Sequence, residues 1–157
     1  MKLPFTHSKS GLKIYLYYGP KGSGKSLFQI YIATQLFKEY YKIEKNYPQL
    51  PKRKYYSSQK FSKELEDKEL GNHLEYWSNP RQLYHLRNCD IGWDEIGKDL
   101  PAGSWADTPK DLKQVFSHLR KRGNRIFANT QIYDDIDISF RRQIDKAYQV
   151  TKLFGSG

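Results

Sequence analysis

Residues 19–26 read Gly-Pro-Lys-Gly-Ser-Gly-Lys-Ser, and this stretch decides the fold. It meets the pattern G-x4-G-K-[ST], known as Walker A, in full. Before it, residues 12–18 form a β-branched and aromatic run that is typical of a buried strand. After it, the chain from Lys25 to about Tyr40 has no Gly or Pro and carries apolar residues at helical spacing. The order strand, glycine-rich loop, helix is the order that a phosphate-binding loop requires.

The residue types in this loop suit a triphosphate and its metal ion. Its glycines allow consecutive backbone amides to point at phosphate oxygens, and the helix that follows adds its positive N-terminus. Lys25 can reach the β- and γ-phosphates, and the Ser26 hydroxyl can ligate Mg2+. A glycine turn with a chance lysine is the alternative, but spacing and flanking segments both disfavour it. We therefore expect ATP and Mg2+ as cofactors, with nucleotide contacts from Gly19, Pro20, Lys21, Gly22, Ser23, Gly24, Lys25, Ser26 and Leu27.

Two acidic residues close a later strand at residues 89–94 and supply what hydrolysis needs. Asp94 would hold Mg2+ through water, and Glu95 would orient and polarise the attacking water. Such strands usually carry four apolar residues in a row, whereas Asp90 and Gly92 interrupt this one. A surface acidic turn is therefore the alternative.

A third polar element follows the strand expected at residues 125–130. Gln131 closes this strand, so its amide could stand near the γ-phosphate and report whether it is present. A solvated glutamine at a strand end is the alternative.

The rest of the chain alternates short strands with helices, which predicts an α/β fold. We expect a P-loop NTPase three-layer sandwich, in which a mostly parallel central sheet is flanked by helices. Further strands are expected at residues 55–57, 73–77 and 146–154, and helices at 62–70, 80–87 and 109–121. Residues 1–154 would form one ATPase domain, and residues 155–157, Gly-Ser-Gly, would be a linker or an expression scar.

The composition of the chain restricts its possible metal sites, its location and its partners. The lone cysteine, Cys89, cannot form an internal disulfide, and a metal site built on a cysteine cluster is excluded. No apolar run approaches the roughly 20 residues that cross a bilayer, and the start has no signal segment, so we expect a cytoplasmic protein. The formal net charge of +10, with 15% aromatic residues, favours a polyanionic partner, although a basic surface without a partner is the alternative.

Together, residues 19–26, the pair Asp94 and Glu95, and the stretch from His118 to Gln131 resemble the FtsK/HerA superfamily of P-loop ATPases. The nearest likeness is to the zonula occludens toxin-like (Zot-like) morphogenesis ATPases of filamentous phages and to viral genome-packaging ATPases. The resemblance implies that Lys25 and Ser26 bind nucleotide and Mg2+, that Asp94 supports the metal, that Glu95 is the catalytic acid and that Gln131 is the sensor.

It also implies a homo-oligomeric ring in which a neighbouring subunit supplies an arginine finger. The candidates are Arg120, Arg122, Arg141 and Arg142. The residues that we expect to be catalytic are Glu95, Lys25, Gln131, Arg122 and Arg142. For each, a solvated or helix-end arginine is the alternative. Zot-like proteins usually continue into a membrane segment, so this chain would be a truncated form or a soluble relative. A full-length protein would act in the host cytoplasm or at the cytoplasmic face of the inner membrane.

Two basic segments would contact DNA, either single-stranded or genomic. One runs from Lys42 to Lys54 with tyrosines interleaved, and the other from Arg120 to Arg125. Bases stack on aromatic rings while cations follow phosphates. The alternative is that both segments are merely solvated. The interleaved tyrosines are Tyr40, Tyr41, Tyr47, Tyr55 and Tyr56.

The leading hypothesis is therefore a Mg-ATP-hydrolysing motor that drives phage or viral DNA export, assembly or packaging. A small nucleoside or nucleotide kinase is a second hypothesis, because such kinases also begin with strand, P-loop and helix. A module that binds ATP without hydrolysing it and switches assembly is a third.

Overall fold

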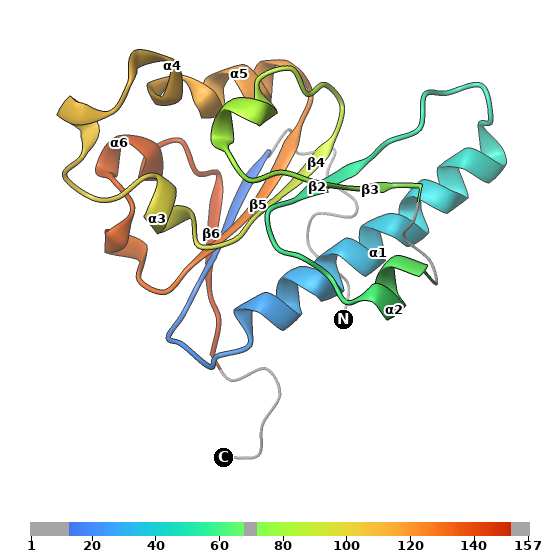
Figure 1. Cartoon of the computed structure of the whole chain (residues 1–157), viewed down its shortest axis with the longest axis horizontal. Coiled ribbons are helices and arrows are strands. Elements are labelled where there is room, and N and C mark those ends of the chain that lie inside the picture. The colour runs from blue at the N-terminus through green and yellow to red at the C-terminus, as the bar shows by residue number, and fades with distance from the viewer. Residues whose placement is uncertain (1–12, 68–71, 152–157) are drawn as a thin grey trace.

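The computed structural model describes residues 13–67 and 72–151, and their six strands form one parallel sheet in the order β3-β2-β4-β5-β1-β6. Helices α1 and α2 cover one face of the sheet, and α3 to α6 cover the other (Figure 1). This arrangement confirms the predicted three-layer sandwich.

The strands are β1 (Ile14–Tyr18), β2 (Tyr55–Ser57), β3 (Leu74–Tyr76), β4 (Asp90–Trp93), β5 (Arg125–Thr130) and β6 (Lys146–Gln149). The α-helices are α1 (Lys25–Asn46), α2 (Lys63–Leu65), α3 (Ile96–Asp99), α4 (Lys110–Lys113), α5 (Val115–Lys121) and α6 (Ile138–Arg141). The 3-10 helices are η2 (Pro80–Leu83), η3 (Trp105–Asp107) and η4 (Tyr133–Asp135).

Alternating side chains of the central strands fill two separate cores. On β1, Ile14 and Leu16 face the layer of α3 to α6, whereas Tyr15 and Tyr17 face α1. This is the period-2 pattern of a strand covered on both faces. Burial also raises the pKa of Tyr17 far above its ordinary value, with nearby Tyr148 adding to the effect. The apolar run of β1 is therefore explained by burial on both sides.

Helix α1 is longer than predicted. It runs to Asn46 rather than to about Tyr40, so the first turns of the basic segment that begins at Lys42 are helical. The reason is tertiary: Tyr40 is 2% exposed, and Glu44 lies 3.3 Å from the buried His73 imidazole. Although α1 has 22 residues, no helix within the ranges 13–67 and 72–151 is long and apolar enough to span a bilayer.

Two other helix predictions are wrong in extent. The turn after Asn79 is the 3-10 helix η2, which ends at Leu83, although Asn79 caps it as expected by accepting a hydrogen bond from the Arg81 amide at 3.0 Å. The helix predicted for residues 109–121 is broken at Gln114 into α4 and α5. Thr108 does not cap it; its hydroxyl donates to the Ser104 carbonyl at 2.8 Å. Parts of the elements predicted at 12–18, 62–70 and 146–154, and the expected linker at 155–157, lie outside the described residues.

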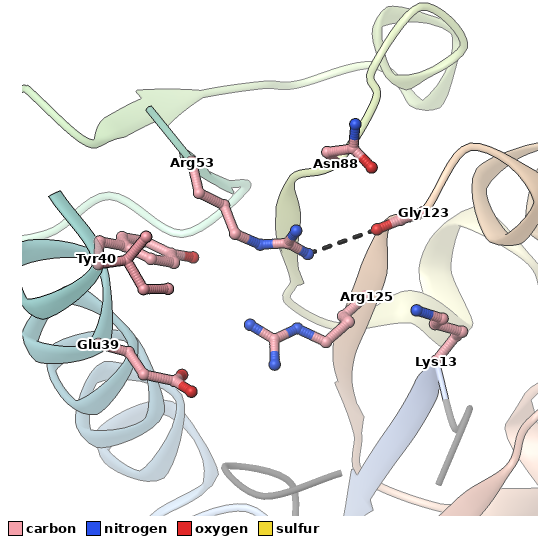
Figure 2. Close-up of a pocket in the computed structure, with 8 residues that line it drawn as sticks. Lys13, Glu39, Tyr40, Arg53, Asn88, Gly123 and Arg125 are labelled. Atoms are coloured by element: carbon pink, nitrogen blue, oxygen red, sulfur yellow. Dashed lines mark hydrogen bonds between the residues drawn. The ribbon is translucent and has the colours of Figure 1, made fainter. Parts of the chain in front are cut away.

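A buried carboxylate lies at the start of β4. Asp90 is fully buried, and two arginines bind both of its oxygens, Arg53 at 3.0 Å and Arg125 at 2.6 and 2.9 Å. The Tyr40 hydroxyl donates to the same group. Figure 2 shows Tyr40, Arg53 and Arg125 converging from three segments around a cavity of about 350 Å³. Burial alone would raise the pKa of Asp90, but Arg125 and Arg53 outweigh it and hold that pKa below its usual value.

The interruptions in the apolar run of β4 therefore have structural causes. Asp90 anchors the start of β4 to Arg125 on β5. Gly92 leaves room for Tyr55, whose hydroxyl a Cβ at this position would overlap. Neither residue places the strand at the surface, because all four positions of β4 are buried.

We predict that Asp90→Asn lowers the free energy of unfolding by about 3–5 kcal/mol, because it leaves two partly buried guanidinium groups without their counter-charge. Since the pKa of Asp90 is lowered in the folded state, its stabilising contribution is present above the unfolded value near 4 and is lost as pH falls through the folded value. Urea denaturation from pH 7 to pH 3 should therefore show the gap between wild type and variant narrowing with acidity. Asp107→Asn, on the exposed η3, is the control, and an equal loss in both variants would contradict the assignment.

Candidate nucleotide-binding site

The glycine-rich loop joins the end of β1 to the start of α1. Gly24 immediately precedes α1 with φ of 93°, a left-handed conformation that residues with a side chain adopt at a cost. Gly19 is enclosed instead, because a Cβ there would collide with the Val150 carbonyl oxygen. Its amide donates to the Thr130 carbonyl at 3.2 Å, which ties the loop to the end of β5.

The start of α1 is prepared for an anion. No side chain caps this helix end, and its first turn contains no acidic residue, so the partial positive charge of a 22-residue helix is left uncompensated. Lys25 is 7% exposed, and its ammonium donates to the Pro20 carbonyl at 3.1 Å. An ammonium group has three donors, so two remain for phosphate oxygens.

The Ser23 hydroxyl is buried without a hydrogen-bond partner among the described residues. The residue is 3% exposed, and its oxygen lies 3.0 Å from where a Cβ on Gly19 would stand. A buried hydroxyl without a partner is destabilising, and such groups call for a ligand or a functional role. A phosphate oxygen held in this loop would supply the missing partner.

The predicted acidic pair follows β4 at the same edge of the sheet. Glu95 adopts a left-handed conformation, with φ of 51° and ψ of 54°, and precedes α3. Its amide donates to Asn129 Oδ1 at 2.9 Å, and Asn129 Nδ2 donates to Asp94 Oδ1 at 2.8 Å. The Asp94 amide donates to the Ser58 hydroxyl at 2.8 Å. The main chain of both residues and the side chain of Asp94 are thus held by neighbouring strand ends.

A cavity of about 460 Å³ brings the predicted elements together. It is lined by Lys21, Gly22, Gly24, Lys25, Ser26, Leu27, Glu95, Lys98 and Gln131. A second cavity of about 450 Å³ shares Glu95, Lys98 and Gln131 with the first and also contacts Asp135. Glu95, Lys98 and Gln131 therefore line both cavities, and the first of these cavities also contains the phosphate-binding loop.

The proposed finger arginines do not line either cavity. Arg122 ends α5, before β5 begins, and its carbonyl accepts a hydrogen bond from the Asn88 amide at 3.0 Å. Arg142 ends α6 and is exposed. Arg120 binds Asp145 at 2.9 Å, and Arg141 binds Asp134 at 2.8 Å. Any of these arginines could therefore act as a finger only at the nucleotide site of a neighbouring molecule.

The donor set suits a hard divalent cation. Within the described residues no cluster of three or more His, Cys, Asp or Glu side chains could hold a metal by itself. Mg2+ keeps several waters and takes only one or two protein oxygens beside substrate phosphates. The exposed Ser26 hydroxyl and the Asp94 carboxylate are ligands of this type. By residue type these two side chains suit Mg2+, although only Ser26 lines the cavity at the phosphate-binding loop and Asp94 lines neither cavity.

Sequence reasoning missed two residues at this site. Lys98 lies in α3 and lines the cavity. It is a basic residue three positions after Glu95, and this short distance from the acidic pair was the only sequence feature that pointed to it. Asn129 was visible as a polar residue that follows the apolar run of residues 126–128, but its partners are far away in sequence. Only the fold shows that Asn129 meets Asp94 and Glu95.

A strand, a glycine-rich loop and a long helix, with an acidic pair ending a nearby parallel strand, define the P-loop NTPase fold. Three solved structures share it. The N-terminal domain of zonular occludens toxin from Neisseria meningitidis is 21% identical, with a TM-score of 0.55, and the match covers 88% of this chain and 76% of that one. The genome packaging NTPase B204 of Sulfolobus turreted icosahedral virus 2 matches in its complex with AMP at 14% identity, a TM-score of 0.53 and coverages of 88% and 75%. Its complex with ATP-gammaS matches at 17% identity with a TM-score of 0.54, and the match covers 88% of this chain and 74% of that one.

The family is identified by sequence. The family model for zonular occludens toxin (Zot) matches residues 13–156, which is most of the chain, and the protein belongs to the Zot family. No curated protein sequence is significantly similar to this chain.

We predict that Ser23→Ala leaves the free protein as stable as wild type or up to about 1 kcal/mol more stable, because it removes a buried hydroxyl without a partner. With Mg-ATP, the rise in melting temperature should be smaller than in wild type, because the variant loses a phosphate contact. Thermal denaturation with and without Mg-ATP measures both. Ser117→Ala, on α5, should leave the nucleotide-induced rise unchanged. A variant that is destabilised when free but keeps the full rise would contradict the assignment.

Proposed function

We propose that this chain is a Mg-ATP-binding and hydrolysing domain that drives the export, assembly or packaging of phage or viral DNA. One observation carries the proposal: the cavity at the phosphate-binding loop is also lined by Glu95 and Gln131, which follow two other strand ends. A loop that only bound phosphate would not need an acid and an amide in the same cavity.

Each residue has a role that follows from its position. Backbone amides of the loop between Lys21 and Ser26 and the Lys25 ammonium bind the phosphates, and their placement before reaction lowers the barrier because no reorganisation is needed. Ser26 and Asp94 hold Mg2+, which would neutralise charge on the phosphate oxygens. Glu95 orients the attacking water and accepts its proton, and Gln131 donates its amide near the γ-phosphate.

The names of the structural relatives support the nucleotide. The viral packaging NTPase was solved with AMP and with ATP-gammaS, so a relative with the same fold holds adenine nucleotides. Its stated role in genome packaging, together with the net charge of +10, supports DNA as the substrate that is moved. Such a motor would act in the host cytoplasm or at the cytoplasmic face of the inner membrane, as a ring of identical subunits.

The fold narrows which basic groups could meet DNA. Arg53 and Arg125 are engaged by Asp90, and Tyr40 and Tyr55 are buried, so these four residues of the two basic segments serve the core. Exposed groups of these segments include Lys42, Lys45, Tyr41 and Tyr47 around the end of α1, with Tyr41 44% and Tyr47 53% exposed. We propose the end of α1 as the main DNA contact, because its cations alternate with accessible rings.

We predict that Glu95→Gln binds ATP with an affinity within about twofold of wild type but hydrolyses it about 100-fold more slowly or worse, because the amide cannot accept a proton from water. Phosphate release and titration with a fluorescent ATP analogue measure the two quantities. Glu75→Gln, on the exposed face of β3, should change neither. Equal hydrolysis by Glu95→Gln and wild type would remove Glu95 from the catalytic role.

Product analysis separates the remaining alternatives. Incubation with ATP and a panel of nucleosides should release free phosphate without a phosphorylated nucleoside. A phosphorylated nucleoside would establish a kinase instead. Binding without turnover, accompanied by nucleotide-dependent oligomerisation in a solution mass measurement, would establish an assembly switch.

We predict that DNA stimulates the ATPase and that stimulation weakens as salt rises. Lys42→Ala/Lys45→Ala should weaken binding to single-stranded DNA and reduce the slope of log K against log salt by about 1.4, since each phosphate contact contributes about 0.7. Lys110→Ala/Lys146→Ala removes the same charge from α4 and β6 and is the matched control. Identical slopes for the two pairs would exclude the end of α1 as the DNA contact.

A further inference from the structure

Asn129 is a fully buried polar side chain on β5, between the phosphate-binding loop and the acidic pair. It is 0% exposed, and both ends of its amide are engaged by the chain after β4. Its oxygen accepts the Glu95 amide at 2.9 Å, and its nitrogen donates to the Asp94 carboxylate at 2.8 Å. One side chain thus fixes both members of the acidic pair.

Glu95 needs such support, because its backbone is in the left-handed region at φ 51° and ψ 54°. A residue with a Cβ pays a steric cost there, and surrounding structure must hold it. The conformation coincides with the turn that leads from β4 into α3 and places Glu95 at the wall of the cavity. The hydrogen bond from its amide to Asn129 is the contact that fixes this turn to β5.

The second hydrogen bond acts on Asp94. It binds one carboxylate oxygen, Oδ1, and so sets the rotation of the carboxyl group. The other oxygen can then face a metal-bound water in a defined direction. Groups that orient a ligand in this way typically change metal affinity or activity by 10- to 100-fold when they are removed.

We infer that Asn129 is a positioning residue for the reaction: its amide turns Glu95 toward the cavity and aligns Asp94 for the Mg2+ water shell. This inference rests on the proposed ATPase function. Asn129 is buried and lines neither cavity, so it would act through the two acids. Gln131 directly follows β5, two residues after Asn129, so the end of this one strand holds the acidic pair and leads into the amide expected near the γ-phosphate.

The chain offers a matched control for a purely structural role. Asn124 is also 0% exposed and also uses both ends of its amide, accepting from the Cys89 amide at 2.9 Å and donating to the Leu86 and Leu119 carbonyls at 2.8 and 3.1 Å. It lies before β5 begins, at the edge of the sheet opposite the phosphate-binding loop. Removing either amide therefore costs the fold a similar set of hydrogen bonds.

The experiment compares Asn129→Ala, Asn129→Asp and Asn124→Ala with wild type. For each we would measure melting temperature, kcat and KM for ATP, and the affinity for a fluorescent ATP analogue with EDTA and across a Mg2+ titration. For Asn129→Ala we expect kcat to fall 10- to 100-fold, KM to stay within about twofold, and the Mg2+ concentration for half-maximal effect to rise about tenfold. Its affinity for the analogue in EDTA should stay unchanged. Asn124→Ala should lose a similar amount of stability and keep wild-type kcat and Mg2+ dependence.

Asn129→Asp keeps the acceptor for the Glu95 amide but places a carboxylate against Asp94. It should retain the fold and also lose kcat by at least tenfold with little change in KM. If Asn129→Ala does not fold, this nearly isosteric variant carries the test. The inference is overturned if the Asn129 variant that folds matches Asn124→Ala in kcat and Mg2+ dependence. A wild-type protein that neither binds nor hydrolyses ATP would instead overturn the proposed function.

Discussion

The parallel pairing of β5 with β1 on one side and β4 on the other is the constraint on which the site depends. Parallel strands end at the same edge of a sheet, so the loop after Tyr18, the amide after Thr130 and the acids after Trp93 are brought together from distant parts of the chain. The registers Tyr18 with Thr130 and Trp93 with Ala128 set their relative heights. Because these contacts are backbone hydrogen bonds, the geometry of the site is fixed by the sheet before any side chain is placed.

Side chains then lock β4 to β5 at both ends. At the start of β4, Asp90 is bound by Arg125 of β5, and at its end Asp94 and Glu95 are bound by Asn129 of β5. Buried polar groups of this kind are tolerated only when their partners are complete, and they disfavour a slip in strand register. A slip of one residue would separate both pairs and would turn the alternating side chains of the strand to the wrong layer. The polar residues inside β4 and β5 therefore specify the alignment that the acidic pair requires.

Local patterns predicted the parts of the fold that local chemistry determines. The glycine-rich loop, β5 with its bounds at Arg125 and Thr130, and the acids at the end of β4 were all visible in the sequence, and the Zot-family likeness was confirmed. The extension of α1 to Asn46 was not, because it depends on contacts to Asp90 and His73 that composition does not show. The break at Gln114 was hidden for the same reason, since apolar spacing continues across it. Lys98 and Asn129 were missed because their roles arise only where strand ends meet.

The structure also separates two kinds of positive charge that look alike in the sequence. Three arginines of the two basic segments form ion pairs with carboxylates, so their charge is largely neutralised within the fold. They are Arg53, Arg120 and Arg125. The lysines at the end of α1 are exposed and lie beyond Tyr40, whose hydroxyl anchors the helix to Asp90. The hydrogen bond from Tyr40 to the buried Asp90 thus holds the last turns of α1 at the edge of the sheet opposite the phosphate-binding loop. The exposed lysines of these turns are Lys42 and Lys45.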